Sequence, residues 1–152
     1  KNQTASLVFN LMMSVAQYEK STIVNRLSSG RHYKVKQGIR GYGGVVPFGY
    51  KRTNKGDVVV DSLNSKSVQY IYKKVNQLKD SKMSKTKKTQ HILRLLKQKG
   101  YTFNGKDFDC YKLRRVLSNP FYMGVINYGS SSSMGTHQPL VSKRLYNLVQ
   151  SV

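Results

Sequence analysis

The sequence predicts an α+β fold that is mostly helical, with a long N-terminal helix, a basic linker, and a compact domain containing a β-hairpin and about four helices. Three observations predict it. Apolar residues recur at helical spacing over residues 4–29. Turn-forming residues separate two Val-rich runs within 45–61. Later segments repeat the helical spacing between capping residues and glycines. We therefore expect a connecting helix over 1–37, a Gly-rich basic linker over 38–44 and a compact domain over 45–152.

The charge of the chain is strongly unbalanced. Its 152 residues carry 27 Lys+Arg against 6 Asp+Glu, a formal net charge of +21. Such a balance disfavours a free-standing enzyme for small molecules and favours a polyanionic partner. Most of the excess follows residue 30, whereas an apolar content of 38% is enough for a modest core and too much for a disordered tail.

The first segment has an apolar first half and a more polar second half. No Gly or Pro interrupts it before Gly30, and the helix can continue to about Gln37 with Gly38 as its C′ residue. A helix this apolar should pack on another helix or subunit, through a face of four residues. These are Leu7, Leu11, Met12 and Val15. Because the chain starts inside this helix, without Met, we expect it to be a piece of a longer protein.

Glycines and cations alternate after this helix. The segment 30–44 is either a flexible tether or a basic strap on phosphates or in a minor groove. Its candidate contact residues are Arg31, Lys34, Lys36 and Arg40. A hairpin is then expected over 45–61, where Pro47 limits or starts the first strand and Val58–Val60 forms the second.

The remaining elements follow from capping and stop signals. Ser84 and Asp109 are expected N-caps, whereas Gly100 and the Asn119-Pro120 pair end helices. The expected helices are 65–79, 85–99, 110–118 and one from about Ser142. Between them we expect a turn or short hairpin at 101–108, a strand within 121–128 and a flexible polar loop at 129–136. The cations that open the helix at 85 oppose the helix dipole, which makes sense if they face phosphate.

No catalytic or metal-binding constellation is visible. Cys110 is expected to be a small core residue, and the three His residues are expected at the surface. The carboxylates are too scattered for a two-metal site, and no phosphate-binding loop is present. The sequence therefore predicts no cofactor. The apolar run from Leu7 to Ala16 is too short to span a membrane.

Three local patterns, in order, resemble the large serine recombinases of phages and transposons. The first is Ser14-Val15-Ala16-Gln17-Tyr18-Glu19-Lys20 and its continuation to Gly30, where the family usually has Glu-Arg rather than Glu19-Lys20. The second is Gly43-Gly44-Val45-Val46-Pro47-Phe48-Gly49-Tyr50. The third is Leu117-Ser118-Asn119-Pro120-Phe121-Tyr122-Met123-Gly124. The segments at 139–141 and 146–150 also match the usual end of the family's recombinase domain.

The resemblance implies a specific role. The parent protein would be a site-specific DNA recombinase or integrase with a serine nucleophile, and this piece would be its DNA-binding domain, inactive alone. Its partners would be double-stranded DNA at an attachment site and its own catalytic domain. The parent would form a homodimer on DNA and a tetramer in synapsis through its other parts. It would act in the cytoplasm of a bacterial cell and be encoded by a phage or another mobile element.

Within this reading, the helix at 110–118 would enter the major groove and read guanine edges. The expected DNA-contact residues beyond the linker are Lys51, Arg52, Lys85, Lys87, Lys88, Lys112, Arg114 and Arg115. Tyr111 is equally compatible with the core and with a thymine methyl. The alternatives are a basic RNA-binding or ribosomal type of protein, a nuclease or recombinase acting alone, and an oligomerisation module built on the first helix.

Overall fold

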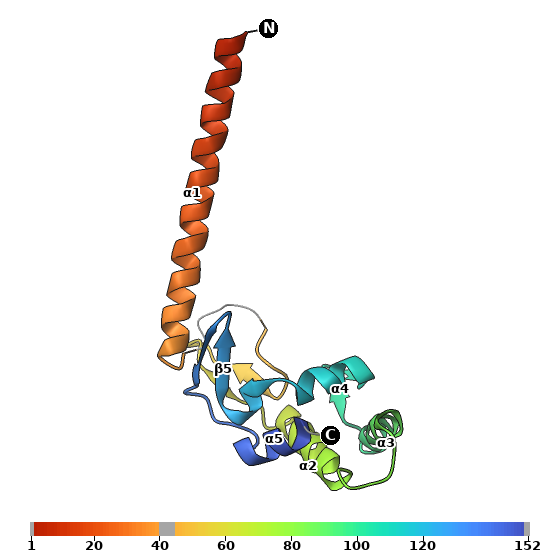
Figure 1. Cartoon of the computed structure of the whole chain (residues 1–152). Helices are drawn as coiled ribbons and strands as arrows, with labels where there is room; N and C mark the ends of the chain where they lie inside the picture. Colours follow the sequence, from red (N-terminus) through yellow and green to blue (C-terminus); the bar gives the residue numbers. More distant parts are fainter. Residues whose placement is uncertain (1, 40–44, 151–152) are drawn as a thin grey trace.

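One helix stands away from the rest of the molecule. The computed structural model describes residues 2–39 and 45–150, and helix α1 (Gln3–Lys36) rises from one end of a body formed by the later elements (Figure 1). The fold is α+β and mostly helical, as predicted. Arg40 and the linker glycines at 41, 43 and 44 lie outside the described residues.

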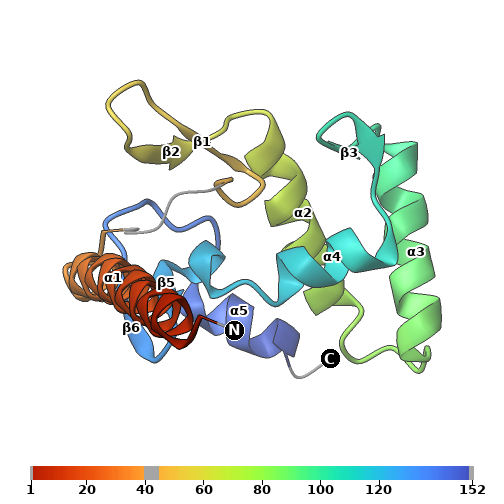
Figure 2. The ribbon, with the colours of Figure 1, turned by 90° about the horizontal axis from the view of Figure 1, so that it is seen from above.

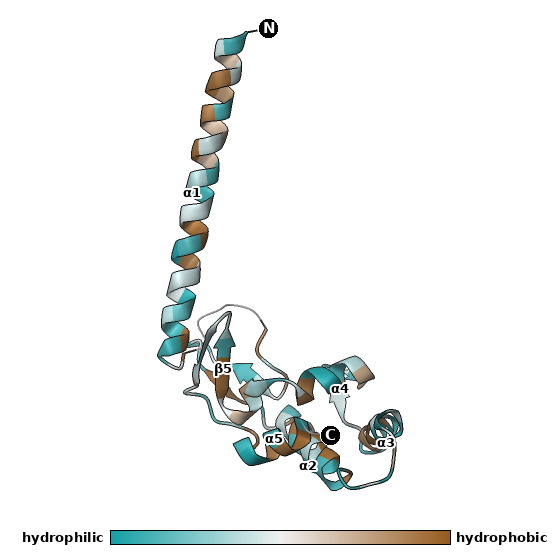
Figure 3. Cartoon of the chain, in the orientation of Figure 1, coloured by the Kyte–Doolittle hydropathy of each residue, from teal (hydrophilic) through white to brown (hydrophobic). Residues whose placement is uncertain are grey.

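Helix α1 is longer than its apolar part. It continues through Gly30 to Lys36, and Gly38 follows with a φ of +74°, in the left-handed conformation expected of a C′ residue. The first half carries its apolar side chains in the open: Leu7, Leu11 and Met12 are 69%, 64% and 66% exposed. Figure 3 shows this apolar surface far from the body. No part of the described chain covers it.

In the described residues the body contains three antiparallel hairpins, one of them the short hairpin expected within 101–108. Strand β1 (Tyr50–Arg52) pairs with β2 (Val58–Val60), β3 (Thr102–Phe103) with β4 (Lys106–Asp107), and β5 (Val125–Tyr128) with β6 (Ser131–Met134). The expected first strand from Val45 is wrong before Tyr50, because Pro47 precedes a turn. The polar loop expected at 129–136 is also wrong. Its serines form β6, which pairs with β5 along its whole length.

Over the part of the chain that the structure describes, four helices and a short 3-10 helix complete the body. Their order is α2 (Asn64–Gln77), α3 (Lys85–Gln98), α4 (Cys110–Leu117), the 3-10 helix η1 (Pro120–Met123) and α5 (Lys143–Gln150). The helices agree with the predicted ranges to within about two residues. The predicted strand at 121–128 is correct only from Val125, because η1 occupies its first part. Figure 2 shows α2 lying behind α4, with α3 and α5 on either side.

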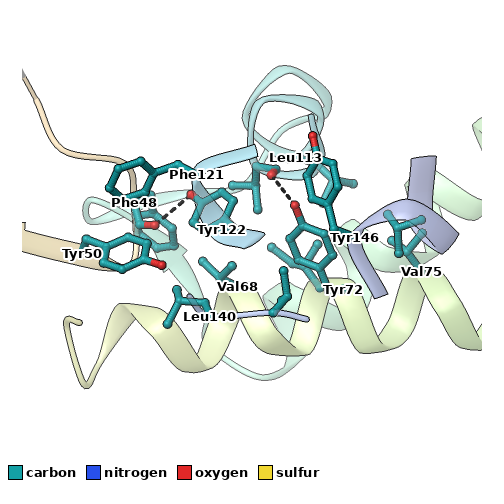
Figure 4. Packing of buried hydrophobic residues seen from close by; sticks show 14 of the residues in the cluster. Phe48, Tyr50, Val68, Tyr72, Val75, Leu113, Phe121, Tyr122, Leu140 and Tyr146 are labelled. Atoms are coloured by element: carbon teal, nitrogen blue, oxygen red, sulfur yellow. Dashed lines mark hydrogen bonds between the residues drawn. The ribbon is translucent and has the colours of Figure 1, made fainter. Parts of the chain in front are cut away.

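The core joins two of the motifs noted in the sequence. The hydroxyl of Tyr122 donates to the carbonyl of Phe48 over 2.8 Å, and Tyr50 lies against Phe121 at 5.0 Å between ring centroids (Figure 4). Gly49 has a φ of +89°, and a Cβ there would lie 3.0 Å from Val68 Cγ2, so glycine is required. The two motifs therefore form one packed unit.

The base of α1 is fixed on the third hairpin. Val35 is fully buried, and its carbonyl accepts a hydrogen bond from the Ser133 hydroxyl. His32 Nδ1 lies 2.8 Å from Ser131 Oγ, and the Thr136 amide donates to Gly38 over 2.9 Å. The serine-rich strand is therefore ordered by the helix that it supports.

Two side-chain placements differ from expectation. Cys110 is exposed, because it is the first residue of α4 and lies at the edge of the body. His137 is buried, stacks on Phe121 at 3.6 Å and lies 2.7 Å from its carbonyl oxygen through Nε2. Among the described helices, none is long and apolar enough to cross a membrane.

Candidate nucleic-acid interface

Helix α4 has only eight residues, so it depends on its surroundings. At its start, the Asp109 carboxylate accepts a hydrogen bond of 2.7 Å from the Lys112 amide, as predicted for an N-cap. This bond is the main cause that lowers the pKa of Asp109. The Lys112 ammonium lies 3.1 Å from the same carboxylate and donates to the Asp107 carbonyl over 2.7 Å. Lys112 thus contacts its own loop.

The end of α4 is stabilised by side chains from other helices. Pro120 lacks the N–H that would bond the Val116 carbonyl, and the Phe121 N–H donates instead to the Asn119 side chain. Three side chains donate to the freed carbonyls. Tyr72 donates to Val116 and Leu117 over 3.0 and 3.1 Å, Tyr146 donates to Ser118 over 3.0 Å, and Gln150 donates to Leu117 over 2.6 Å. Figure 4 shows Tyr72 and Tyr146 within the core beneath this helix end.

The opposite side of α4 faces outward. Leu113 and Val116 are buried, which leaves an exposed stripe at the spacing i, i+3, i+4 and i+7. The stripe consists of Tyr111, Arg114, Arg115 and Ser118. Tyr111 is 73% exposed, so its core alternative is excluded. Helix α4 is therefore short, held at both ends, and carries two arginines on its exposed side.

Some of the predicted cations on α3 gather beside this stripe. Lys85, Lys88 and Arg114 line a groove of about 380 Å³ between α3 and α4, which has an apolar floor. The Lys88 ammonium donates to the Lys79 carbonyl over 3.0 Å and so closes the corner between α2 and α3. The Ser84 hydroxyl caps α3 by accepting a 3.4 Å hydrogen bond from the Lys87 amide, and the Lys87 residue is exposed. Arg115 lines a separate hollow of about 270 Å³.

The other predicted contact residues lie at a distance from this groove. Lys51 and Arg52 are exposed on β1. Arg31, Lys34 and Lys36 occupy the last turns of α1, rather than a separate linker. Arg31 donates to the Tyr128 hydroxyl over 3.3 Å, which lowers the pKa of Tyr128. Figure 1 places the base of α1 and helices α3 and α4 at opposite ends of the body. The predicted residues thus form an extended surface rather than one cluster.

The sequence reasoning missed the side chains that hold this surface in place. These side chains belong to Tyr72, Tyr146 and Gln150, which lie on amphipathic segments. In such a segment the sequence does not indicate which carbonyl a tyrosine or glutamine side chain will bond. The Asn119-Pro120 pair does carry a signal. It predicts helix-end carbonyls without local donors, and therefore the need for donors from elsewhere.

One protein family and two solved structures are similar to this chain. The sequence matches the family described as Recombinase over residues 57–152. No curated protein matches it. The fold is similar to a chain in a structure described as an LSR–DNA complex, with 19% identity, a TM-score of 0.67 and coverage of 83% of this chain and 38% of that chain.

A second similar structure comes from work on the sequence requirements of the Listeria innocua prophage attP site, with 19% identity and a TM-score of 0.66. That match covers 83% of this chain and 50% of the other. The chain therefore spans no more than half the length of these two solved chains, and their likeness concerns the fold. Since the family match covers more than half of the sequence and contains all of α4, the chain belongs to the Recombinase family.

Proposed function

We propose that this chain is the part of a site-specific serine recombinase that binds double-stranded DNA at its attachment sites, with α4 in the major groove. One observation carries the proposal: the anchored helix presents Arg114 and Arg115 on its exposed side, each at the edge of a surface hollow. An arginine can pair through two hydrogen bonds with the O6 and N7 atoms of guanine. The family match and the net charge of +21 support a DNA partner.

The dimensions of α4 suit this role. An α-helix with its side chains is about 10–12 Å across and fits a major groove about 12 Å wide, and the eight residues of α4 give it a length of about 12 Å. Lys85 and Lys87, at the start of α3, would contact phosphates beside the groove. Lys112 would orient the loop before α4 rather than read a base, because its ammonium already contacts Asp107 and Asp109.

The base of α1 would carry a second set of contacts. Arg31, Lys34 and Lys36 would lie near phosphates or the minor groove, together with Arg40. The apolar face of the first half of α1 would pack on the catalytic domain of the same protein or on another subunit, which explains its exposure here. We also propose that strand cleavage, dimer formation on DNA and synapsis as a tetramer belong to the complete recombinase.

Selection of bound sequences from a random duplex library at near-physiological salt tests the proposal. The intact chain should return a reproducible site, and R114A or R115A should relax the preference at one base position and cost about 1–3 kcal/mol. K87A should weaken all duplexes alike and lower the salt slope by about one unit. R144A, on the exposed side of α5, serves as the control of equal charge. If R114A and R115A lose the same affinity for every sequence, α4 is not the recognition helix. If the chain binds structured RNA more tightly than duplex DNA, it belongs instead to the class of RNA-binding proteins.

A further inference from the structure

A second basic surface lies on the outer side of α2, away from α4. Its centre is Tyr70, whose ring centroid lies 5.7 Å from the ammonium of Lys74 and 5.7 Å from the ammonium of Lys99. Tyr101 packs beside it, with 5.5 Å between ring centroids. We call these four residues the Tyr70 cluster. It joins α2 to the end of α3, and none of its members belongs to the predicted DNA-contact residues.

The direction of this surface follows from helix geometry. The Tyr72 hydroxyl bonds the carbonyls of Val116 and Leu117, so the Tyr72 side chain points toward the end of α4. Tyr70 and Lys74 are each two positions from Tyr72, which places them about 200° around the helix. They therefore lie on the side of α2 opposite α4. A duplex held by α4 would be separated from Tyr70 and Lys74 by about the thickness of α2, roughly 10 Å.

The charges of the cluster are not balanced within the chain. In the described residues, the ion pairs join Lys97 to Asp107 and Lys112 to Asp109, and neither includes Lys74 or Lys99. Two further exposed lysines, Lys66 and Lys73, lie on the outward part of α2. Holding the ammonium groups of Lys74 and Lys99 against one ring without a carboxylate is unfavourable unless an anion binds beside them.

The ring contacts indicate which part of a nucleic acid would bind. Tyr70 already contacts two ammonium groups and the Tyr101 ring, so it positions the cations rather than offering a free face to a base. Ammonium groups held in this way suit phosphate oxygens, which carry no sequence information. The cluster thus fits the backbone of a duplex.

We propose that the Tyr70 cluster is a second, sequence-independent site for duplex DNA, and that one chain bridges two duplex segments, one on α4 and one on α2. This inference rests on the proposed DNA-binding function and adds a second segment to it. A recombinase must bring two DNA segments together, and a second phosphate site would hold a neighbouring segment close without selecting its sequence.

A bridging assay tests the inference. A biotinylated duplex that carries the selected site is immobilised and loaded with the full chain. A labelled duplex of unrelated sequence is then added, and both the bound chain and the captured label are measured. The intact chain should retain the second duplex, and K74Q/K99Q should reduce its capture at least about tenfold while loading on the first duplex matches that of the control. The matched control is K106Q/K143Q, which removes two exposed charges elsewhere.

Each result has a distinct meaning. If the salt slope of the second capture falls by about two units in K74Q/K99Q, the two lysines contact phosphates. Capture that persists in K74Q/K99Q would mean that self-association or another surface bridges the duplexes, and would overturn the inference. Absence of second-duplex capture by the intact chain would also overturn it, as would capture of single strands in preference to duplex. Failure to load on the first duplex would instead refute the proposed function.

Discussion

The hydroxyl of Tyr72 offers the sharpest test of how α4 is held. Tyr72 is fully buried, and burial raises its pKa well above the usual value, so the hydroxyl remains a donor at ordinary pH. The substitution Y72F removes one oxygen and keeps the ring. It therefore deletes two hydrogen bonds, to Val116 and Leu117, without opening a large cavity.

The cost can be worked out from the two acceptors. In Y72F the Leu117 carbonyl keeps its 2.6 Å hydrogen bond from Gln150, so the substitution leaves this acceptor with a donor. The Val116 carbonyl keeps a long contact of 3.5 Å from the Asn119 amide and a contact from the Ser118 amide, which is already bonded to Arg114, because Pro120 has no N–H to offer. A buried acceptor left without a good partner costs about 1–3 kcal/mol. We expect Y72F to lower the free energy of unfolding by this amount.

Urea unfolding followed by circular dichroism measures the change, and hydrogen exchange locates it. The m-value should stay constant, and the amides of α4 should exchange faster while those of α3 are little affected. Y111F is the matched control, because Tyr111 is 73% exposed, and it should change the unfolding free energy by less than about 0.5 kcal/mol. A loss below about 0.5 kcal/mol in Y72F, or uniform acceleration of exchange, would refute the idea that Tyr72 anchors the helix end.

Three further changes test other parts of the structure. G49A should destabilise the domain by about 2–4 kcal/mol in urea unfolding, because the φ of +89° and the contact at 3.0 Å both oppose a Cβ. Hydrogen bonds from the Asn64 side chain and the Leu63 amide lower the pKa of Asp61 from its ordinary value of 3.8. The ionised carboxylate therefore stabilises the fold fully above the unfolded pKa, and this contribution is lost as the pH falls through the lower pKa of the folded state. D61N should remove this part of the acid dependence of stability. S133A should loosen the base of α1, seen as a broader distribution of spin-label distances between α1 and α2 with little change in helix content.

The helices were predictable because residues close in sequence determine where each helix begins and ends. Ser84 and Asp109 do cap α3 and α4, and Gly38 does follow α1 in the left-handed conformation. The candidate recognition face was predictable for the same reason: once the bounds of α4 are known, the spacing of Arg114 and Arg115 places both outside.

The parts that sequence reasoning missed depend on partners far away in the chain. Nothing in a run of serines predicts β6, since its order comes from pairing with β5 and from the bond between Ser133 and Val35, 98 residues apart. His137 is buried for a similar reason, because Phe121 provides both a ring and a carbonyl. Contacts of this kind override weak local propensity.

The motifs that resemble the family and the face proposed to read DNA occupy different residues, and this separation has a consequence. Asn119, Pro120 and Tyr122 stop α4, free its last carbonyls and bond the turn at Phe48, so they set where the helix lies. Arg114 and Arg115 are exposed and take part in none of these hydrogen bonds. Base preference could therefore change through the exposed stripe of α4 while the frame that positions it stays intact, whereas a change in the frame should weaken binding to every sequence at once.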